Sequence, residues 1–179
     1  MDFDSHPENN TVRQFAPAEP STSPKLIVLG LGNPLLGDDG VGWVVVQALQ
    51  SRLAKSGIET DLLAGGGISL MERLVGYTTA IIVDSIYTGC TPRGTVTSFP
   101  LEALENPFAG HTGSAHETNL LTALEMGRTL GAQLPDQVLI VAIESPDVYD
   151  FNEALSPPVA AAVSPACEVV LRLLCSSLN

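Results

Sequence analysis

The stretch LIVLGLGNPLLGDDGVG, from Leu26 to Gly42, contains the pattern that decides the fold. Its first four residues, 26–29, are apolar and predict a buried strand of a parallel sheet. The apolar run stops at the turn Gly30–Asn33, and the acidic pair Asp38-Asp39 then precedes a new amphipathic pattern. A strand that ends in glycines and leads through carboxylates into a helix is a place where α/β folds commonly build a site.

Strand-like and helix-like segments alternate along the rest of the chain. Apolar or alternating runs predict four further strands, at Ile58–Leu63, Ala80–Val83, Thr95–Phe99 and Val138–Ile143. Helical spacing predicts helices that begin at Val41, at Ile68, at the capping-box sequence Ser114–Glu117 and at Ser156-Pro157, the last one running past Pro165 with a kink. The alternation predicts a single α/β domain with a mostly parallel sheet and an antiparallel edge strand at 95–99.

The composition narrows the kinds of partner. The 179 residues suit one domain of about 150 residues with a tail. Residues 1–24 are rich in Pro, Ser, Thr, Asn and acid, which predicts a disordered tail ahead of a domain at 25–179. The net charge of −12, from 20 acidic and 8 basic residues, argues against nucleic acid and anionic membranes. It suits a cationic or metal-bearing partner, although acidity that serves only solubility explains it equally well.

Nothing in the sequence indicates export, a membrane span or a disulfide framework. The first residues lack a basic region followed by an apolar run, which argues against a signal peptide. No apolar stretch approaches the ~20 residues of a membrane-spanning helix. The cysteines, Cys90, Cys167 and Cys175, lack metal-site spacing, and the last two are expected in the core. We therefore expect a cytoplasmic protein without a membrane partner.

Three polar residues are expected to meet at the edge where the parallel strands end. Asp39 follows the first strand, Asp84 ends the third, and His116 starts a helix that packs on the same sheet. The backbone dipole disfavours a positive charge in the first turn of a helix, so the His116 ring tends to stay neutral, the form that binds a metal. Two carboxylates and a neutral imidazole are suitable ligands for a divalent first-row metal.

Each of these residues also has a simpler structural interpretation. Asp39, like Asp38, would cap the helix that begins at Val41, and Asp84 would hold a loop by accepting backbone N–H bonds. His116 would only occupy a helix start. Spacing alone leaves open whether the three residues share a metal site or serve these separate roles.

Nucleotide binding and nucleophilic catalysis are competing functional interpretations. The glycines of Gly30–Asn33 invite a dinucleotide-binding interpretation, but Leu35 stands where the third glycine of that motif belongs, and no P-loop lysine follows. The glycines more simply allow a tight turn and the close approach of another backbone segment. No Gly-x-Ser-x-Gly motif occurs, and neither Ser85 nor Cys90 has an identifiable His and acid partner in the sequence.

From about Lys25 onward the sequence resembles the [NiFe]-hydrogenase maturation endopeptidases. The resemblance rests on four segments: GLGNPLLGDDGVG at 30–42, IIVDSIYTG at 81–89, SAHETNLLTALEMGRTLG at 114–131 and IESPDVYDFNEALSPPVAAAVSPACEVVL at 143–171. It implies a twisted five-stranded sheet between helices. It also implies a peptidase, with no Ser or Cys nucleophile evident, that removes a C-terminal extension from the hydrogenase large-subunit precursor after nickel insertion.

The resemblance assigns roles to individual residues of this sequence. The metal-contacting positions of the family map onto Asp39, Asp84 and His116, where the first is commonly Glu in relatives. The metal is then most simply nickel that the substrate carries, with no organic cofactor and with the enzyme as a monomer. Five further residues are expected to line a cleft for the substrate: Gly32, Asn33, Asp38, Gly65 and Gly66.

One position departs from the family pattern. Many relatives have an Asp immediately before the Gly-Gly of the loop after the second strand, and here that position is Ala64. The departure keeps open an alternative function, a maturation chaperone that binds the large subunit without cutting it. A nucleotide-binding α/β module is the other alternative.

Overall fold

The computed structural model describes residues 25–105, 115–145 and 151–177, and side chains at 104–105 and 115–119 are not among those described. The predicted tail, 1–24, lies outside the described residues. The elements are β1 (Leu26–Leu31), η1 (Gly37–Gly40), α1 (Val41–Lys55), β2 (Glu59–Leu63), α2 (Ile68–Leu74), β3 (Thr79–Ile86), β4 (Val96–Pro100), η2 (Leu101–Glu105), α3 (Ala115–Thr129), β5 (Gln137–Glu144) and α4 (Pro157–Ser177).

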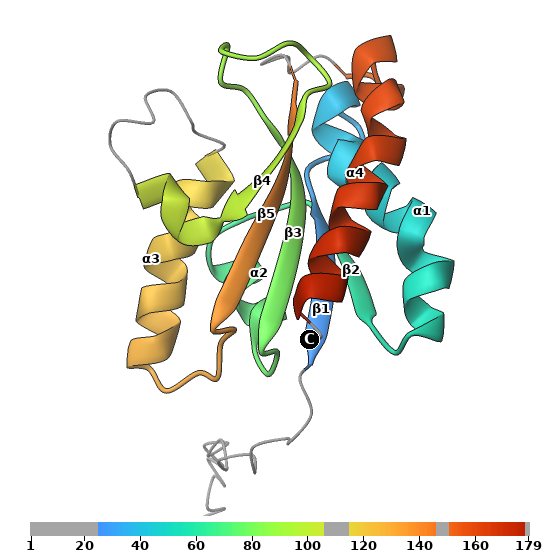
Figure 1. Cartoon of the computed structure of the whole chain (residues 1–179). Helices are drawn as coiled ribbons and strands as arrows, with labels where there is room; N and C mark the ends of the chain where they lie inside the picture. Colours follow the sequence, from blue (N-terminus) through green and yellow to red (C-terminus); the bar gives the residue numbers. More distant parts are fainter. Residues whose placement is uncertain (1–24, 106–114, 146–150, 178–179) are drawn as a thin grey trace, which may run out of the picture.

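The described strands form one sheet in the order β2-β1-β3-β5-β4. The first four are parallel, and β4 pairs antiparallel with β5 at the edge. Helices α1 and α4 cover one face, while α2 and α3 cover the other (Figure 1). Both the five-stranded, mostly parallel sheet and its antiparallel edge strand are therefore confirmed.

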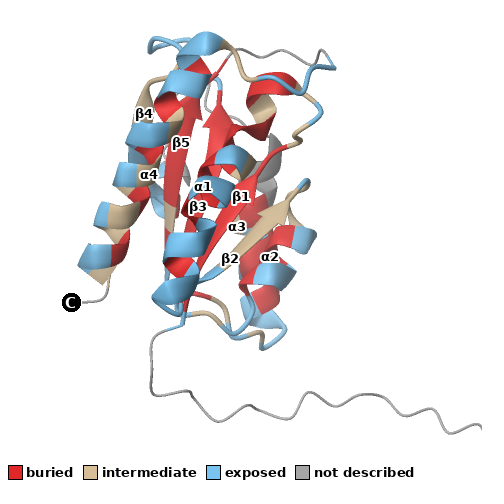
Figure 2. Cartoon of the chain, turned by 90° about the vertical axis from the view of Figure 1, so that its right-hand side faces the viewer, coloured by how far each residue is buried: buried red, intermediate tan, exposed pale blue. Residues whose placement is uncertain are grey.

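The central strands β1, β3 and β5 are largely apolar because helices cover both of their faces, and the polar residues of β3 and β5 lie at or near their ends. All six residues of β1 are buried, and β3 and β5 are nearly as well covered (Figure 2). The prediction that Asp84 ends the third strand is wrong, since β3 continues to Ile86. Parallel pairing with β5 carries the strand past this carboxylate, with Asp84 opposite Ala142 and Ile86 opposite Glu144.

The order of the strands sets where a site can form. From β1 the chain crosses through α1 to β2 on one side, and then returns through α2 to β3 on the other side. The carboxyl ends of β1 and β3 therefore flank the point where the connections diverge, which is the usual ligand position of open α/β sheets.

Helix α4 combines a buried face with an exposed one. By length and composition alone it is apolar enough to cross a membrane, so the expectation that no stretch reaches that length is wrong. One face of the helix is nevertheless buried in the core that it shares with α1 and the sheet. The residues of this face are Val159, Ala162, Ala166, Val170 and Leu174. Cys175, expected in the core, is exposed, and Cys167 is half-buried. The helix continues through Pro165, and the kink stays a prediction.

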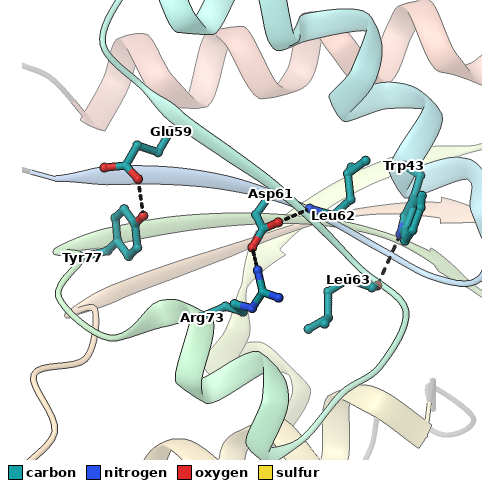
Figure 3. Close-up of polar contacts among 7 residues, drawn as sticks. All are labelled: Trp43, Glu59, Asp61, Leu62, Leu63, Arg73 and Tyr77. Carbon is teal, nitrogen blue, oxygen red and sulfur yellow. Dashed lines mark hydrogen bonds and ion pairs between the residues drawn. The ribbon is translucent and has the colours of Figure 1, made fainter.

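Polar side chains join β2 to neighbouring elements on the outer side of the sheet. The Tyr77 hydroxyl donates to Glu59 at 2.7 Å, and Arg73 of α2 pairs with Asp61 (Figure 3). Burial is the main cause that raises the pKa of Tyr77 to about 12, and the hydrogen bond to Glu59 and the negative charges of Glu59 and Asp61 add to it.

The raised pKa of Tyr77 predicts a loss of stability at high pH. The unfolded chain releases the phenolic proton near pH 10, while the folded protein keeps it to about pH 12. The folded state thus binds more protons in this window, and the free energy of unfolding falls as the pH rises through it. Urea denaturation at pH values below and within the window should show this fall. Tyr77→Phe should reduce it, and Tyr87→Phe, which changes an exposed tyrosine, should not.

Candidate functional site

The short 3-10 helix η1 carries the two adjacent aspartates between β1 and α1. The prediction that Asp38 or Asp39 caps α1 is wrong, since Gly40 occupies the N-cap and no side chain there makes a capping bond. Because η1 turns the backbone before α1 begins, both carboxylates are directed to other segments. Asp39 bonds Asn33 and Ser85, whereas Asp38 bonds Ser156.

Asp39 is half-buried and closes the glycine turn that follows β1. Its Oδ2 accepts a hydrogen bond from the backbone N–H of Asn33 at 2.6 Å. Its Oδ1 accepts one from the hydroxyl of Ser85 at 3.2 Å. The carboxylate therefore links the end of β1 to the end of β3. Each oxygen retains a lone pair beyond these single bonds.

Asp84 and Ser85 lie side by side in the last part of β3, and both are buried. The Asp84 side chain is 1% exposed, and its Oδ1 accepts the backbone N–H of Ser85 at 2.8 Å. Ser85 thus contacts both carboxylates, Asp84 through its amide and Asp39 through its hydroxyl. The structure in this way connects two of the three predicted site residues.

Ser85 was not assigned to the site by sequence reasoning, which considered it only as a nucleophile. The sequence feature that could have identified Ser85 as a site residue is its position directly after Asp84, in a strand that runs parallel to β1. A hydroxyl on that strand can reach an acidic residue that follows the neighbouring strand. The exact partner depends on how η1 turns, which no local pattern specifies.

Asp38 is buried and fastens the start of α4. Its Oδ1 accepts the backbone N–H of Ser156 at 2.6 Å, and its Oδ2 accepts the Ser156 hydroxyl at 2.7 Å. Helix α4 begins directly after this serine, whose carbonyl oxygen accepts from Ala160, so the predicted start at Ser156-Pro157 is confirmed. The two hydrogen bonds hold η1, and Asp39 with it, against the opposite end of the chain.

Ser156→Ala is expected to lower the free energy of unfolding by about 1–2 kcal/mol, because it removes a hydroxyl donor from the buried Asp38 carboxylate. Urea denaturation of the wild type and the variant measures the difference. Ser176→Ala is a matched control on the same helix, since that exposed hydroxyl only contacts the carbonyl of Arg172. An equal effect of both substitutions would contradict a special role for the bond between Asp38 and Ser156.

His116 is the second residue of α3. Its side chain lies outside the described residues, so its contact with Asp39 and Asp84 stays a prediction. Among the side chains that the structure describes, no group of three or more His, Cys, Asp or Glu is placed to hold a metal ion. The described part of the site is thus the pair of carboxylates that Ser85 connects.

The glycine turn after β1 allows the backbone of Asp39 to approach the end of the strand closely. Gly32 has φ +114°, and a Cβ there would overlap the backbone carbonyl oxygen of Asp39. The side chain of Asn33 accepts the backbone N–H of Leu35 at 3.0 Å and stabilises the same turn. The glycines therefore permit close backbone approach, as predicted, and their places next to the substrate stay predictions.

The loop after β2 lies open beside this turn. Ala64 is exposed, and a Cβ at Gly65 would meet no atom within 4 Å. The indole of Trp43, from α1, donates to the carbonyl oxygen of Leu63 at 3.3 Å and anchors the last residue of β2 (Figure 3). The role of Gly65 and Gly66 in a substrate cleft stays a prediction.

Glu144 is a third buried acid at this edge, after Asp38 and Asp84, and sequence reasoning missed it. It ends β5, is 3% exposed, and accepts hydrogen bonds from the backbone N–H groups of Thr88 and Gly89 and from the hydroxyls of Thr88 and Thr91. These four bonds occupy both carboxylate oxygens and order the loop after β3. Glu144 therefore has a structural role next to the site, because its carboxylate is used to hold the loop after β3.

Comparison with known proteins identifies the family. A sequence model of hydrogenase maturation proteases matches residues 44–173. This chain belongs to the hydrogenase maturation protease family. The hydrogenase 2 maturation protease of Escherichia coli K12 is 30% identical over 152 residues, which cover 84% of this chain and 90% of that protein. The hydrogenase expression/formation protein HupD of Thiocapsa roseopersicina is 29% identical over 155 residues, covering 86% of this chain and 69% of that protein.

Solved structures of hydrogenase maturation proteases share the fold. The maturating endopeptidase HybD of Escherichia coli matches with a TM-score of 0.67 at 28% identity, over 86% of this chain and 93% of that chain. A maturation protease HybD from Thermococcus kodakarensis matches with a TM-score of 0.65 at 24% identity, over 83% of this chain and 98% of that chain. Family membership and these relatives make the chain a peptidase.

Proposed function

We propose that this hydrogenase maturation protease is an endopeptidase that removes the C-terminal extension of a [NiFe]-hydrogenase large-subunit precursor after nickel insertion. The observation that carries the proposal is the connection of Asp39 to Asp84 through Ser85, at the point where the strand connections diverge, in a chain of this family. Processing of a hydrogenase precursor is also the activity that the names of the relatives indicate.

The donor chemistry of the site suits a metal that the substrate carries. Asp39 is partly open to solvent, so a lone pair of its carboxylate can reach a metal ion on a docked polypeptide. Asp84 supplies a second carboxylate, and His116 is the predicted third ligand. Oxygen and imidazole donors suit nickel and other divalent first-row metals. A metal held there can polarise the scissile carbonyl or a water molecule.

The distribution of charge supports a cationic or metal-bearing substrate at this edge. Five of the described acids lie at the carboxyl ends of the parallel strands, in η1 or in the segment that pairs with the loop after β1: Asp38, Asp39, Asp84, Glu144 and Glu153. Apart from Arg93, the described basic residues lie toward the other edge, before β1 or in the later turns of helices: Lys25, Arg52, Lys55, Arg73, Arg128 and Arg172. The resulting field favours positive charge at the site.

Incubation of the protein with a nickel-loaded precursor, followed by intact-mass measurement, tests the proposal. We expect the mass of the large subunit to fall by that of the C-terminal extension, and we expect nickel-free precursor to stay intact. A stable complex with uncut precursor would instead favour the chaperone alternative, which the Ala64 departure keeps open. The cytoplasmic location and the monomeric state stay predictions from the sequence.

A further inference from the structure

Two exposed apolar residues lie on paired backbone segments beside the candidate site. Leu35 follows β1 and is 49% exposed, and Phe151 precedes α4 and is 86% exposed. The segments that carry them pair as parallel strands at Leu36 and Asn152. The backbone N–H of Asn152 donates to the carbonyl oxygen of Leu35 at 3.0 Å, and the N–H of Gly37 donates to the carbonyl oxygen of Asn152.

The register of this pairing places Leu35 beside Phe151. The hydrogen bond from Asn152 to Leu35 brings the backbone of Leu35 next to that of Phe151, the residue that precedes Asn152. Here the matched pair is Leu36 and Asn152. Two largely exposed apolar residues are therefore neighbours along these paired segments, and Leu35 stands four residues before Asp39 in the chain. We call these two side chains the apolar platform.

The apolar platform rests on an ordered backbone. Asp38 holds Ser156 at one end, and the side chain of Asn152 accepts the backbone N–H of Ala154 at 3.0 Å within the same segment. At the other end, the Asn33 side chain accepts the N–H of Leu35. A ligand that docks here meets a backbone already in place, which lowers the entropy cost of binding.

Exposure of large apolar side chains to water is unfavourable, and a binding partner that covers them removes this unfavourable term. Removing apolar surface from water favours binding, and an aromatic ring offers a large apolar area to cover. A second copy of the chain is a poor occupant, because the acidic edges of two copies would repel each other. The substrate polypeptide must approach this same edge to reach Asp39, so its apolar side chains are available to cover the platform.

We propose that Leu35 and Phe151 dock an apolar side chain of the precursor polypeptide, close to the segment that reaches Asp39 and Asp84. This inference rests on the proposed function for the identity of the substrate. It assigns binding, not chemistry, to the two residues. The platform then contributes to recognition of the polypeptide itself, beyond recognition of its metal.

The test compares Phe151→Ala with the wild type on the nickel-loaded precursor. We expect KM and the Kd for the precursor to rise about tenfold, which corresponds to about 1.4 kcal/mol, with kcat changed less than about twofold. Phe151→Leu should restore part of the affinity, and Leu35→Ala should weaken it to a smaller extent. Leu130→Ala is the matched control, since Leu130 is 78% exposed but lies beyond the far end of α3.

Several outcomes would overturn the docking role. Unchanged KM and Kd in Phe151→Ala would do so, as would a wild-type dimer that this variant dissociates. The proposed function fails separately: if the wild type binds but never cuts the precursor, cleavage is excluded, while weaker binding of Phe151→Ala would still support the platform. Because Phe151 is so exposed, its substitution should leave the fold intact, which thermal unfolding can verify.

Discussion

Asp39→Asn is expected to lower the rate of precursor cleavage by about a hundredfold or more, because it removes the negative charge at the most accessible carboxylate of the site. The amide keeps the shape of the side chain and one oxygen acceptor, so the glycine turn after β1 should persist. Its half-buried position limits the loss in the free energy of unfolding to about 1 kcal/mol. Single-turnover cleavage of nickel-loaded precursor, followed by intact mass, measures the effect.

Two companion variants show which feature of the site is responsible. Ser85→Ala keeps both carboxylates but removes the hydroxyl that donates to Asp39, and we expect a smaller loss of activity than in Asp39→Asn. Glu153→Gln removes an exposed charge from the same edge and should leave cleavage close to the wild-type rate. Wild-type cleavage by Asp39→Asn would exclude this carboxylate from the chemistry. An equally severe effect in Glu153→Gln would show that the overall charge of the edge matters, not the position of Asp39.

Gly42→Ala is expected to destabilise the protein severely, by about 3–5 kcal/mol or enough to prevent folding. Gly42 is the second residue of α1, and a Cβ there would overlap the backbone carbonyl oxygens of Val83 in β3 and Leu31 in β1. A Cβ at Gly30 would likewise stand 2.5 Å from the carbonyl oxygen of Gly42. These neighbours are backbone atoms of buried strands, so they cannot move aside as a flexible side chain can.

The matched control for this substitution is Gly65→Ala. A Cβ at Gly65 would meet no atom within 4 Å, so the free energy of unfolding should change by less than about 1 kcal/mol. Urea denaturation of both variants gives the comparison directly. Equal stability of Gly42→Ala and the wild type would mean that α1 does not lie as close to β1 and β3 as the structure places it.

Local sequence patterns were sufficient to predict the architecture, because apolar periodicity and turn residues indicate where each strand and helix lies. They predicted each described strand and the antiparallel edge at 95–99, with errors only in the ends of strands. Asp84 was misplaced at a strand end because backbone pairing with β5 carries β3 through a polar residue. Cys175 was misplaced in the core because its helix has an exposed face that composition does not reveal.

The site was predicted in part. Asp39 and Asp84 were correctly assigned to one edge of the sheet, because the ends of adjacent parallel strands must lie together. Their connection through Ser85 was not predicted, and neither was the role of Glu144 in ordering the loop after β3. Both depend on side-chain contacts between residues far apart in the chain, 46 positions for Ser85 and Asp39 and 56 for Thr88 and Glu144.

By itself the sequence determined the order of strands and helices, the glycine turn after β1 and the edge at which the acidic residues gather, since all of these follow from local periodicity and chain direction. Only the tertiary structure decided that Asp39 closes that turn and reaches Ser85, while the adjacent Asp38 holds the start of α4, 118 positions away. The physical reason is the 3-10 turn of η1, which precedes the close packing of α1 on β1 and β3 at Gly42 and directs two neighbouring carboxylates to different partners.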